Sequence, residues 1–97
     1  MKRIHLLAIG GTTLHNIAIT LKNDGFVVSG SDDEIYDPAY TDLQKAGLLP
    51  AELGWHEERI TRDIDVVIAG GKVQPDNPEL QKAREYGLTV YSYSEFI

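Results

Sequence analysis

Short apolar runs alternate along this chain with segments whose apolar residues have helical spacing. Residues 4–9 are apolar except at one position, which is typical of a strand buried on both faces of a parallel sheet. After a Gly-Gly-Thr-Thr interruption, apolar residues recur at i, i+3, i+4 and i+7, namely Leu14, Ile17, Ala18 and Leu21. This spacing predicts a helix that is capped by Thr12 or Thr13 and stopped by Gly25.

The same alternation continues into the middle of the chain. Residues 26–29 predict a second strand, and residues 39–46 predict a short helix. Residues 48–64 have no clear period. A third buried strand is expected at residues 66–69, where the sequence is again a run of apolar residues.

The last third of the chain predicts one more helix and one more strand. The helix is expected to start with Pro78 in its first turn, where the missing N–H costs nothing, after a cap at Asp76 or Asn77. Residues 88–91 predict a strand, and residues 94–97 resemble the capped start of a further helix.

Strands that alternate with helices predict right-handed βαβ crossovers. We therefore expect an α/β, Rossmann-like three-layer domain with an open, mostly parallel sheet and helices on both faces. The length of 97 residues is enough for one domain, so residues 1–97 are expected to form a single unit. The abrupt end of the pattern suggests a fragment of a longer protein.

Composition and charge limit the kinds of molecule that this chain is expected to bind. Fifteen acidic against nine basic residues give a net charge of −6, which opposes binding to nucleic acid. The absence of cysteine excludes a disulfide scaffold and thiolate chemistry, and it fits a cytoplasmic protein. No apolar run is long enough to span a membrane, and the histidines lack metal-ligand spacing. We therefore expect no membrane partner and no metal.

Three glycine-containing loops follow the predicted strands, at the edge of the sheet where α/β domains bind ligands. In the first loop, the N–H groups of Gly11, Thr12 and Thr13 and the dipole of the following helix favour a phosphate or diphosphate. The dinucleotide frame G-x-G-x-x-G falls on Ala8, Gly10 and Thr13, so only its middle glycine is present. This makes NAD a less favoured ligand, and a tight turn without any ligand is the alternative.

Charged residues near these loops are candidates for contacts to the ligand. Asp32 follows Gly10 by 22 positions, where nucleotide-binding sheets place an acid on ribose hydroxyls; the alternative is a turn cap. Lys72 follows the third loop and either supplies charge to a ligand or is solvated. His15, on the first turn of the first helix, either contacts the anion or is solvated.

Two other ring side chains have structural explanations. His5 lies within the first strand and is expected to be packed or hydrogen-bonded in the core. Trp55 is expected to be a packing residue, with a stacking platform for a ligand as the alternative. The sequence has no G-x-x-x-x-G-K-[ST] loop, no G-x-S-x-G elbow and no persuasive carboxylate pair, so we predict a binding domain without catalytic residues of its own.

Several of these strings together resemble a known family. They are Ile9-Gly10-Gly11-Thr12-Thr13-Leu14 with Ile17-Ala18, then Gly30-Ser31-Asp32, then Asp76-Asn77-Pro78-Glu79. Over the whole chain they resemble the N-terminal domain of Mur ligases, in the branch of the UDP-N-acetylmuramate–L-alanine and murein-tripeptide ligases. The resemblance implies a three-domain enzyme of which this chain is the first domain.

The resemblance also implies a function and a site. The N-terminal domain would bind the UDP part of UDP-N-acetylmuramic acid, whereas ATP and Mg²⁺ would bind to a central domain that is absent here. In the family, the muramyl carboxylate is activated as an acyl phosphate and then attacked by an amine of an amino acid or peptide. The residues implied to bind UDP are Gly10, Gly11, Thr12, Thr13, Leu14, Ser31, Asp32, Gly70, Gly71 and Lys72, with His15 and Trp55 as further candidates.

The chain departs from the alanine-adding members at several of these positions. Those members usually have a glycine at Thr13, a Ser-Ser pair at the third loop, and a histidine at Trp55. The Gly11-Thr12 pair and the Tyr36-x-Pro38 spacing are closer to the tripeptide-adding members. Two alternatives to the family function remain, a free-standing NAD(H)-binding module and a protein-interaction domain with an empty cleft.

Overall fold

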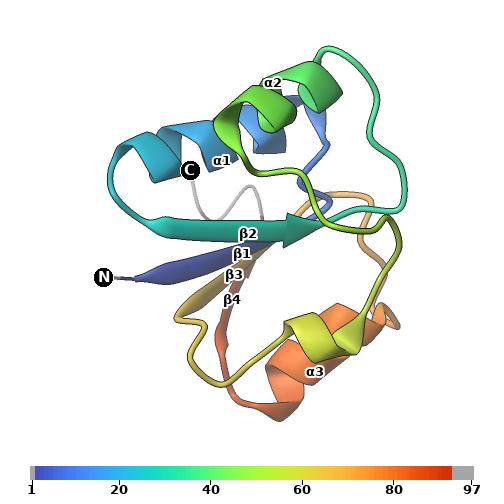
Figure 1. The fold of residues 1–97 in the computed structure, drawn as a ribbon. Helices are drawn as coiled ribbons and strands as arrows, with labels where there is room; N and C mark the ends of the chain where they lie inside the picture. Colours follow the sequence, from blue (N-terminus) through green and yellow to red (C-terminus); the bar gives the residue numbers. More distant parts are fainter. Residues whose placement is uncertain (1, 93–97) are drawn as a thin grey trace.

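The computed structural model describes residues 2–92, in which four parallel strands form one sheet (Figure 1). Along the chain they are β1 (Arg3–Leu7), β2 (Val27–Ser31), β3 (Val66–Ala69) and β4 (Thr89–Ser92). Their spatial order is β2-β1-β3-β4, so the first strand lies inside the sheet and the chain winds outward in both directions. The predicted α/β, Rossmann-like class is confirmed, with a sheet that is parallel throughout the described residues.

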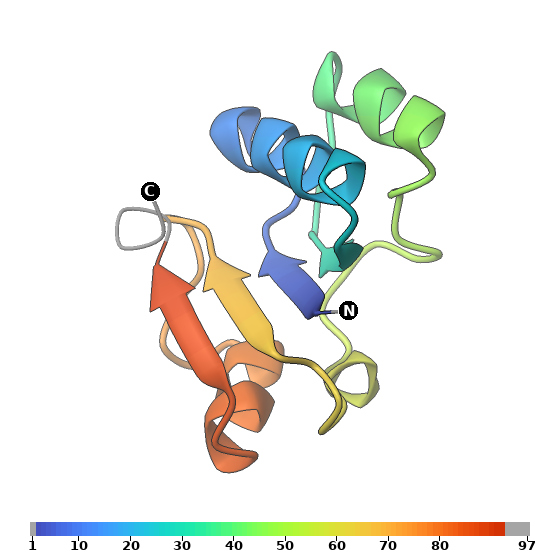
Figure 2. The same cartoon turned by 90° about the vertical axis from the view of Figure 1, so that its left-hand side faces the viewer.

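Helices cover both faces of the sheet (Figure 2). One face carries α1 (Thr12–Asn23) and α2 (Ala39–Ala46), and the other carries α3 (Pro78–Glu85) and the short 3-10 helix η1 (Glu57–Arg59). Each face has its own apolar cluster. One cluster contains Leu6 and Leu14, and the other contains Leu7 and Leu80, so neighbouring residues of β1 enter opposite layers.

Some predicted boundaries move by a few residues. β1 ends at Leu7 rather than at residue 9, because Ala8 takes a left-handed conformation with φ of 72° and its carbonyl accepts the Gly11 N–H at 3.0 Å. The first position of the dinucleotide frame therefore keeps a glycine-like backbone although it is alanine. β2 runs on to Ser31. The predicted helix start at residues 94–97 lies outside the described residues.

The predicted helix caps are only partly right. The N-cap of α1 is Gly11, without a side-chain hydrogen bond, so the prediction of Thr12 or Thr13 is wrong and both threonines lie within the helix. At α3, the Asn77 side chain accepts the N–H groups of the second and third helical residues at 2.9 and 3.2 Å, and Pro78 occupies the first position. The prediction for α3 is confirmed at Asn77.

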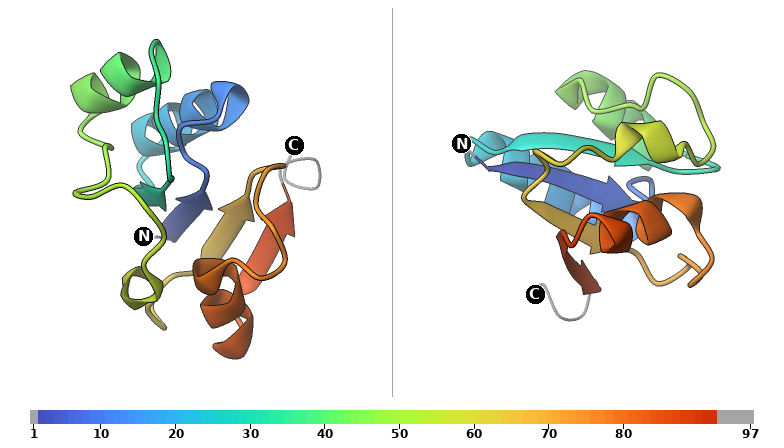
Figure 3. Two further views of the ribbon diagram at one scale, coloured as in Figure 1. Left: turned by 90° about the vertical axis from the view of Figure 1, so that its right-hand side faces the viewer. Right: turned by 90° about the horizontal axis from the view of Figure 1, so that it is seen from below.

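The parallel strands bring the loops that follow them to one edge of the sheet (Figure 3). Close packing there depends on Gly30 of β2. A Cβ added to Gly30 would lie 2.5 Å from Cδ1 and 2.7 Å from Cβ of Ile9, which is fully buried. Gly30 therefore allows the segment after β1 to pass directly over β2.

Replacing Gly30 with alanine is expected to lower the free energy of unfolding by about 1–3 kcal/mol, because the new methyl group overlaps the body of Ile9. The matched control is Gly71→Ala, since nothing lies within 4 Å of a Cβ at Gly71. Urea denaturation of both variants provides the measurement. Equal stabilities of the two variants would contradict this account of β2 packing.

Candidate functional site

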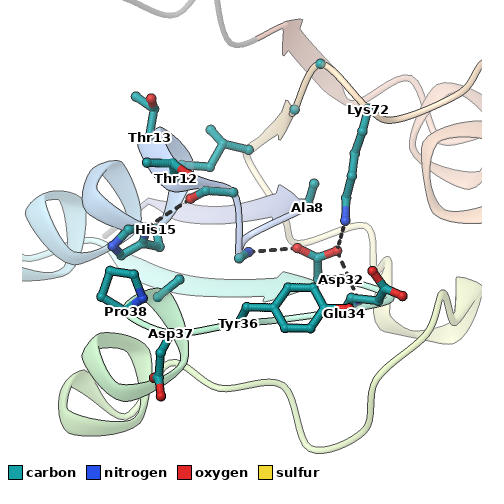
Figure 4. A pocket seen from close by; sticks show the side chains of 16 residues that line it. Ala8, Thr12, Thr13, His15, Asp32, Glu34, Tyr36, Asp37, Pro38 and Lys72 are labelled. Atoms are coloured by element: carbon teal, nitrogen blue, oxygen red, sulfur yellow. Dashed lines mark hydrogen bonds and ion pairs between the residues drawn. The ribbon is translucent and has the colours of Figure 1, made fainter.

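The loops that follow β1, β2 and β3 enclose a cleft of about 470 Å³ at the carboxyl edge of the sheet (Figure 4). The edge is the one expected for ligand binding in open α/β sheets. The sequence-predicted residues that line the cleft are Gly10, Gly11, Thr12, Thr13, Leu14, His15, Asp32, Gly70, Gly71 and Lys72. Three separate segments of the chain thus meet at one site.

The first turn of α1 faces this cleft. Its first intrahelical bond runs from His15 N–H to the Gly11 carbonyl at 2.9 Å, so the N–H groups of Thr12, Thr13 and Leu14 have no acceptor within the helix. These three N–H groups and the positive end of the helix dipole form a binding position for an anion.

The amides of the two glycines before α1 are already used inside the protein. Gly10 N–H donates to Asp32 Oδ2 at 2.9 Å, and Gly11 N–H donates to the Ala8 carbonyl at 3.0 Å. In this structure both N–H groups therefore donate to acceptors within the protein, and a role for them in binding a diphosphate stays a prediction. The free donors start at Thr12.

Gly10 and Gly70 allow the three loops to approach one another closely. A Cβ at Gly10 would lie 2.9 Å from both Asp32 Oδ2 and Ile35 Cγ1. A Cβ at Gly70 would lie 2.9 Å from Leu14 Cδ1. The glycines of the first and third loops thus serve the packing of the cleft walls.

Asp32 joins all three loops. Its side chain is fully buried, with Oδ2 on Gly10 N–H and Oδ1 accepting Asp33 N–H at 2.8 Å. Oδ1 also lies 2.5 Å from Nζ of Lys72, which comes from the third loop. The Asp32 carboxylate thus caps the turn after β2 and is a structural centre of the cleft, whereas its predicted contact to a ribose stays a prediction.

Lys72 is ion-paired, although 48% of its side chain is exposed. Besides Asp32, its ammonium contacts Asp33 Oδ1 at 2.7 Å. Burial opposes the charge, but the hydrogen bonds to the two carboxylates raise the pKa of Lys72, and the same ammonium holds the pKa of Asp33 below its usual range. An ammonium has three N–H donors, so one is left for a ligand.

His15 is buried, with only 3% of its surface exposed, and this excludes the solvated alternative. Its Nδ1 lies 2.9 Å from the Gly11 carbonyl oxygen, and its Nε2 lies 3.4 Å from Asp42 Oδ2 on α2. The ring lines the cleft next to the first turn of α1.

The segment between β2 and α2 forms a wall of the cleft that the sequence analysis did not assign to the site. Glu34, Tyr36, Asp37 and Pro38 line it, and the Tyr36 side chain is 69% exposed. The hydroxyl of Tyr36 donates to Glu34, and this bond raises the pKa of Tyr36. The Tyr36-x-Pro38 spacing was the available signal, although it carried no ligand role.

Comparisons with known proteins agree with this architecture. Residues 3–97 match the model of the Mur ligase family, catalytic domain. The chain is 36% identical over 97 residues to UDP-N-acetylmuramate–L-alanine ligase of Caldicellulosiruptor saccharolyticus, covering 100% of this chain and 21% of that protein. It is 38% identical to the enzyme of the same name from Lactiplantibacillus plantarum, covering 96% of this chain and 21% of that protein.

The chain belongs to the Mur ligase family.

Solved structures extend the match to three dimensions. UDP-N-acetylmuramate-alanine ligase of Thermotoga maritima has a TM-score of 0.87 at 27% identity, covering 99% of this chain and 22% of that chain. UDP-N-acetylmuramate:L-alanyl-gamma-D-glutamyl-meso-diaminopimelate ligase of Neisseria meningitides has a TM-score of 0.81 at 30% identity. The match covers 95% of this chain and 28% of that chain. This chain therefore spans about a fifth of the length of its curated relatives.

Two predicted site residues of this Mur ligase chain lie away from the cleft. Trp55 lines a neighbouring depression with Lys72 and packs against both apolar clusters, so its packing interpretation is confirmed. The Ser31 hydroxyl donates to Glu79 Oε1 of α3 at 2.8 Å, on the opposite face of the sheet. Ser31 thus connects the end of β2 to α3 and does not line the cleft.

Glu79 is the centre of a buried polar cluster that the sequence analysis missed. Its Oε1 also contacts His5 Nε2 at 2.7 Å, and its Oε2 accepts the His56 N–H at 2.9 Å. Arg59 donates to the Ser31 hydroxyl at 2.8 Å. The expectation that His5 is hydrogen-bonded in the core is confirmed, and the cluster joins β1, β2, η1 and α3.

The pKa of Glu79 results from two opposing effects. Burial by itself raises it, but hydrogen bonds from His5, the His56 N–H and Ser31 outweigh burial and hold the pKa below its ordinary value of 4.5. Ionised Glu79 therefore stabilises the fold above that pH, and this contribution is lost as pH falls through the folded-state pKa.

Residues 2–92 meet neither the requirements of a metal site nor those of a membrane-spanning helix. Among residues 2–92, no group of three or more His, Cys, Asp or Glu side chains could hold a metal ion. No helix within the same range is long and apolar enough to cross a membrane.

Replacing Glu79 with glutamine is expected to lower the free energy of unfolding by about 3 kcal/mol at pH 7, because a neutral amide replaces the buried carboxylate that accepts from His5, Ser31 and the His56 N–H. The loss should shrink as pH falls below 4.5, because the unfolded wild type then takes up a proton at Glu79 while the folded state does so only at lower pH. Urea denaturation between pH 3.5 and 7 measures both effects. The control is Glu85→Gln on the same helix, whose side chain is 64% exposed, and a pH-independent loss in E79Q would contradict the assignment.

Proposed function

We propose that this chain is the UDP-binding, N-terminal domain of a Mur ligase that acts on UDP-N-acetylmuramic acid. The observation that carries the proposal is the set of unused N–H groups at the first turn of α1, which faces a cleft at the carboxyl edge of the sheet. Both relatives and structural neighbours bear names of ligases acting on UDP-N-acetylmuramate. The family membership and this local chemistry point to the same ligand.

Within this proposal, the diphosphate binds to the N–H groups of Thr12, Thr13 and Leu14. The third donor of Lys72 supplies positive charge, while its other two donors stay on Asp32 and Asp33. The uridine and sugar extend along the loop after β2 and the glycine pair after β3. In this arrangement the Asp32 carboxylate mainly holds Gly10 and Lys72 in position. The ribose lies close to the Asp32 backbone.

The rest of the reaction belongs to parts of the protein outside this chain. ATP and Mg²⁺ would bind in a central domain, where the muramyl carboxylate becomes an acyl phosphate. A further domain would bring the amine, from L-alanine or from a murein tripeptide. We propose the cytoplasm as the location, the remaining domains as the partners, and no catalytic residue within these 97 residues.

The NAD(H)-binding alternative is not favoured. The family model and the relatives are Mur ligases, and Thr13 occupies the third glycine position of the dinucleotide frame. NADH is therefore the matched competitor ligand. It contains a diphosphate but lacks uridine.

Isothermal titration of the 97-residue chain with UDP, UDP-N-acetylmuramic acid and NADH tests the function. UDP and its sugar derivative should bind, and at 100 times their Kd they should stabilise the chain by about 2.7 kcal/mol in thermal unfolding. NADH should bind more weakly. Preferential binding of NADH, or no response to millimolar UDP compounds, would overturn the proposal.

Replacing Thr12 with proline is expected to weaken UDP binding about ten- to a hundredfold while the fold is kept. Thr12 is the first residue of α1, where proline is tolerated, and Gly11 has the extended ψ of 148° that a following proline prefers. The change thus removes one N–H donor to a charged ligand, worth about 1.5–3 kcal/mol.

The matched control for this variant is Thr12→Ala, which keeps the N–H and removes only the hydroxyl. Titration calorimetry gives the affinities, and circular dichroism confirms the fold. If the proline and alanine variants bind UDP equally well, the Thr12 amide does not hold the ligand.

A further inference from the structure

The outer edge of β2 has no neighbouring strand among the described residues, because β2 stands first in the order β2-β1-β3-β4. Val27 N–H donates to the Lys2 carbonyl at 3.0 Å. The Ser31 carbonyl accepts the Ala8 N–H at 2.8 Å. Alternate residues of a strand bond to opposite sides, so residues 27, 29 and 31 bond to β1. Gly30 therefore turns its N–H and C=O groups to the free edge.

The backbone groups of Gly30 are buried without a partner. Gly30 is buried, and neither its N–H nor its carbonyl has a hydrogen-bond partner among residues 2–92. Buried backbone groups in native proteins are nearly always paired. A ligand that offers one donor and one acceptor side by side, as a residue of an added strand does, would satisfy both groups.

A groove of about 390 Å³ opens onto this edge of β2. It lies between residues 28–30 and residues 47–51, the segment that follows α2. Leu48, Leu49 and Pro50 make one wall of the groove apolar. The volume is at the small end of the range for ligand pockets, so the groove suits a small ligand with an aliphatic part.

Arg59 gives the groove a positive charge. It is the only Asp, Glu, Lys or Arg among the described lining residues, although the chain has a net charge of −6. Its guanidinium donates to the Ser31 hydroxyl and to the carbonyls of Gly54 and Glu52, which uses three of its five N–H donors. Its contact with buried Glu79 is longer, at 4.0 Å. Two donors are left for a carboxylate.

We propose that this groove binds an N-acylated aliphatic amino acid. The ligand N–H donates to the Gly30 carbonyl, and one carboxylate oxygen accepts the Gly30 N–H, as in a pair of antiparallel residues. The other carboxylate oxygen binds Arg59, and the aliphatic side chain packs on Leu48 and Leu49. The inference does not depend on the proposed function, because the groove and the UDP cleft share no lining residue.

Titration of the ¹⁵N-labelled 97-residue chain with N-acetyl-L-leucine, followed by ¹H–¹⁵N correlation spectra, tests the inference. The Gly30 amide signal should move and saturate with a Kd of about 1 mM, an affinity typical of so small a ligand. Amide signals of the UDP cleft should stay in place. A response that maps away from Gly30, or that does not saturate at tens of millimolar, would overturn the proposal.

Two matched ligands test the separate contacts on the wild-type chain. N-acetyl-L-leucinamide has no charge for Arg59 and should bind about tenfold more weakly. The 4-methylpentanoate ion keeps the carboxylate and the aliphatic part but has no N–H for the Gly30 carbonyl, so it should bind about fivefold more weakly. If all three ligands bind equally well, the polar contacts are not made and the inference is wrong.

The test variant is Ala51→Glu. Ala51 is exposed and lines the groove, so the added carboxylate repels that of the ligand and leaves the core unchanged. N-acetyl-L-leucine should bind about fivefold more weakly to this variant. The matched control is Gln44→Glu, which adds the same charge at an exposed position of α2 outside the groove. Equal affinities of A51E and Q44E would contradict the proposed place of the carboxylate.

A competition experiment separates this inference from the proposed function. UDP should bind with the same Kd in the presence and absence of saturating N-acetyl-L-leucine, because the two sites are distinct. Displacement of UDP by the acylated amino acid would overturn the inference and leave the proposed function standing. A Gly30 response in a chain that binds no UDP compound would support the inference and overturn the proposed function.

Discussion

The buried carboxylate of Asp32 is the contact on which the site depends. It comes from the end of β2, accepts the Gly10 N–H from the first loop, and pairs with Lys72 from the third loop. A buried carboxylate is tolerated only when its oxygens are hydrogen-bonded or paired, so each loop must stay where it supplies a partner. The spacing between the three loops, and hence the shape of the cleft, follows from this requirement.

Glu79 supplies a second buried carboxylate, which holds the end of β2 from the face of the sheet that carries α3. Glu79 binds Ser31, the residue before Asp32, together with His5 of β1 and the backbone of His56. The two acids thus act on the end of β2 from opposite faces of the sheet. Buried ion pairs add little net stability, but they specify which groups must meet. In this domain they set the position of the loop edge relative to the helices.

The charge pattern of the cleft links this framework to ligand binding. An acidic chain with carboxylates along the cleft is a poor general binder of anions. The N–H donors without a protein acceptor lie at the first turn of α1, and Lys72 and His15 line the same cleft, so the proposed diphosphate position is this turn. Backbone N–H groups have fixed directions, and the cleft has few mobile cationic side chains. Such a site favours a ligand whose shape matches the N–H groups over free inorganic phosphate.

The sequence by itself determined the α/β class, the residues of the helices and strands to within a few positions, and the edge of the sheet where the site lies. These follow from apolar periodicity, from Asn77-Pro78 and from glycines at strand ends, all of which are local signals. Tertiary structure decided the strand order, the use of Gly10 and Gly11 amides inside the protein, the Asp32–Lys72 pair and the Glu79 cluster. Apart from the turn between Gly11 and Ala8, each of these joins segments far apart in the chain, and the sequence spacing did not show that their groups would bond to one another.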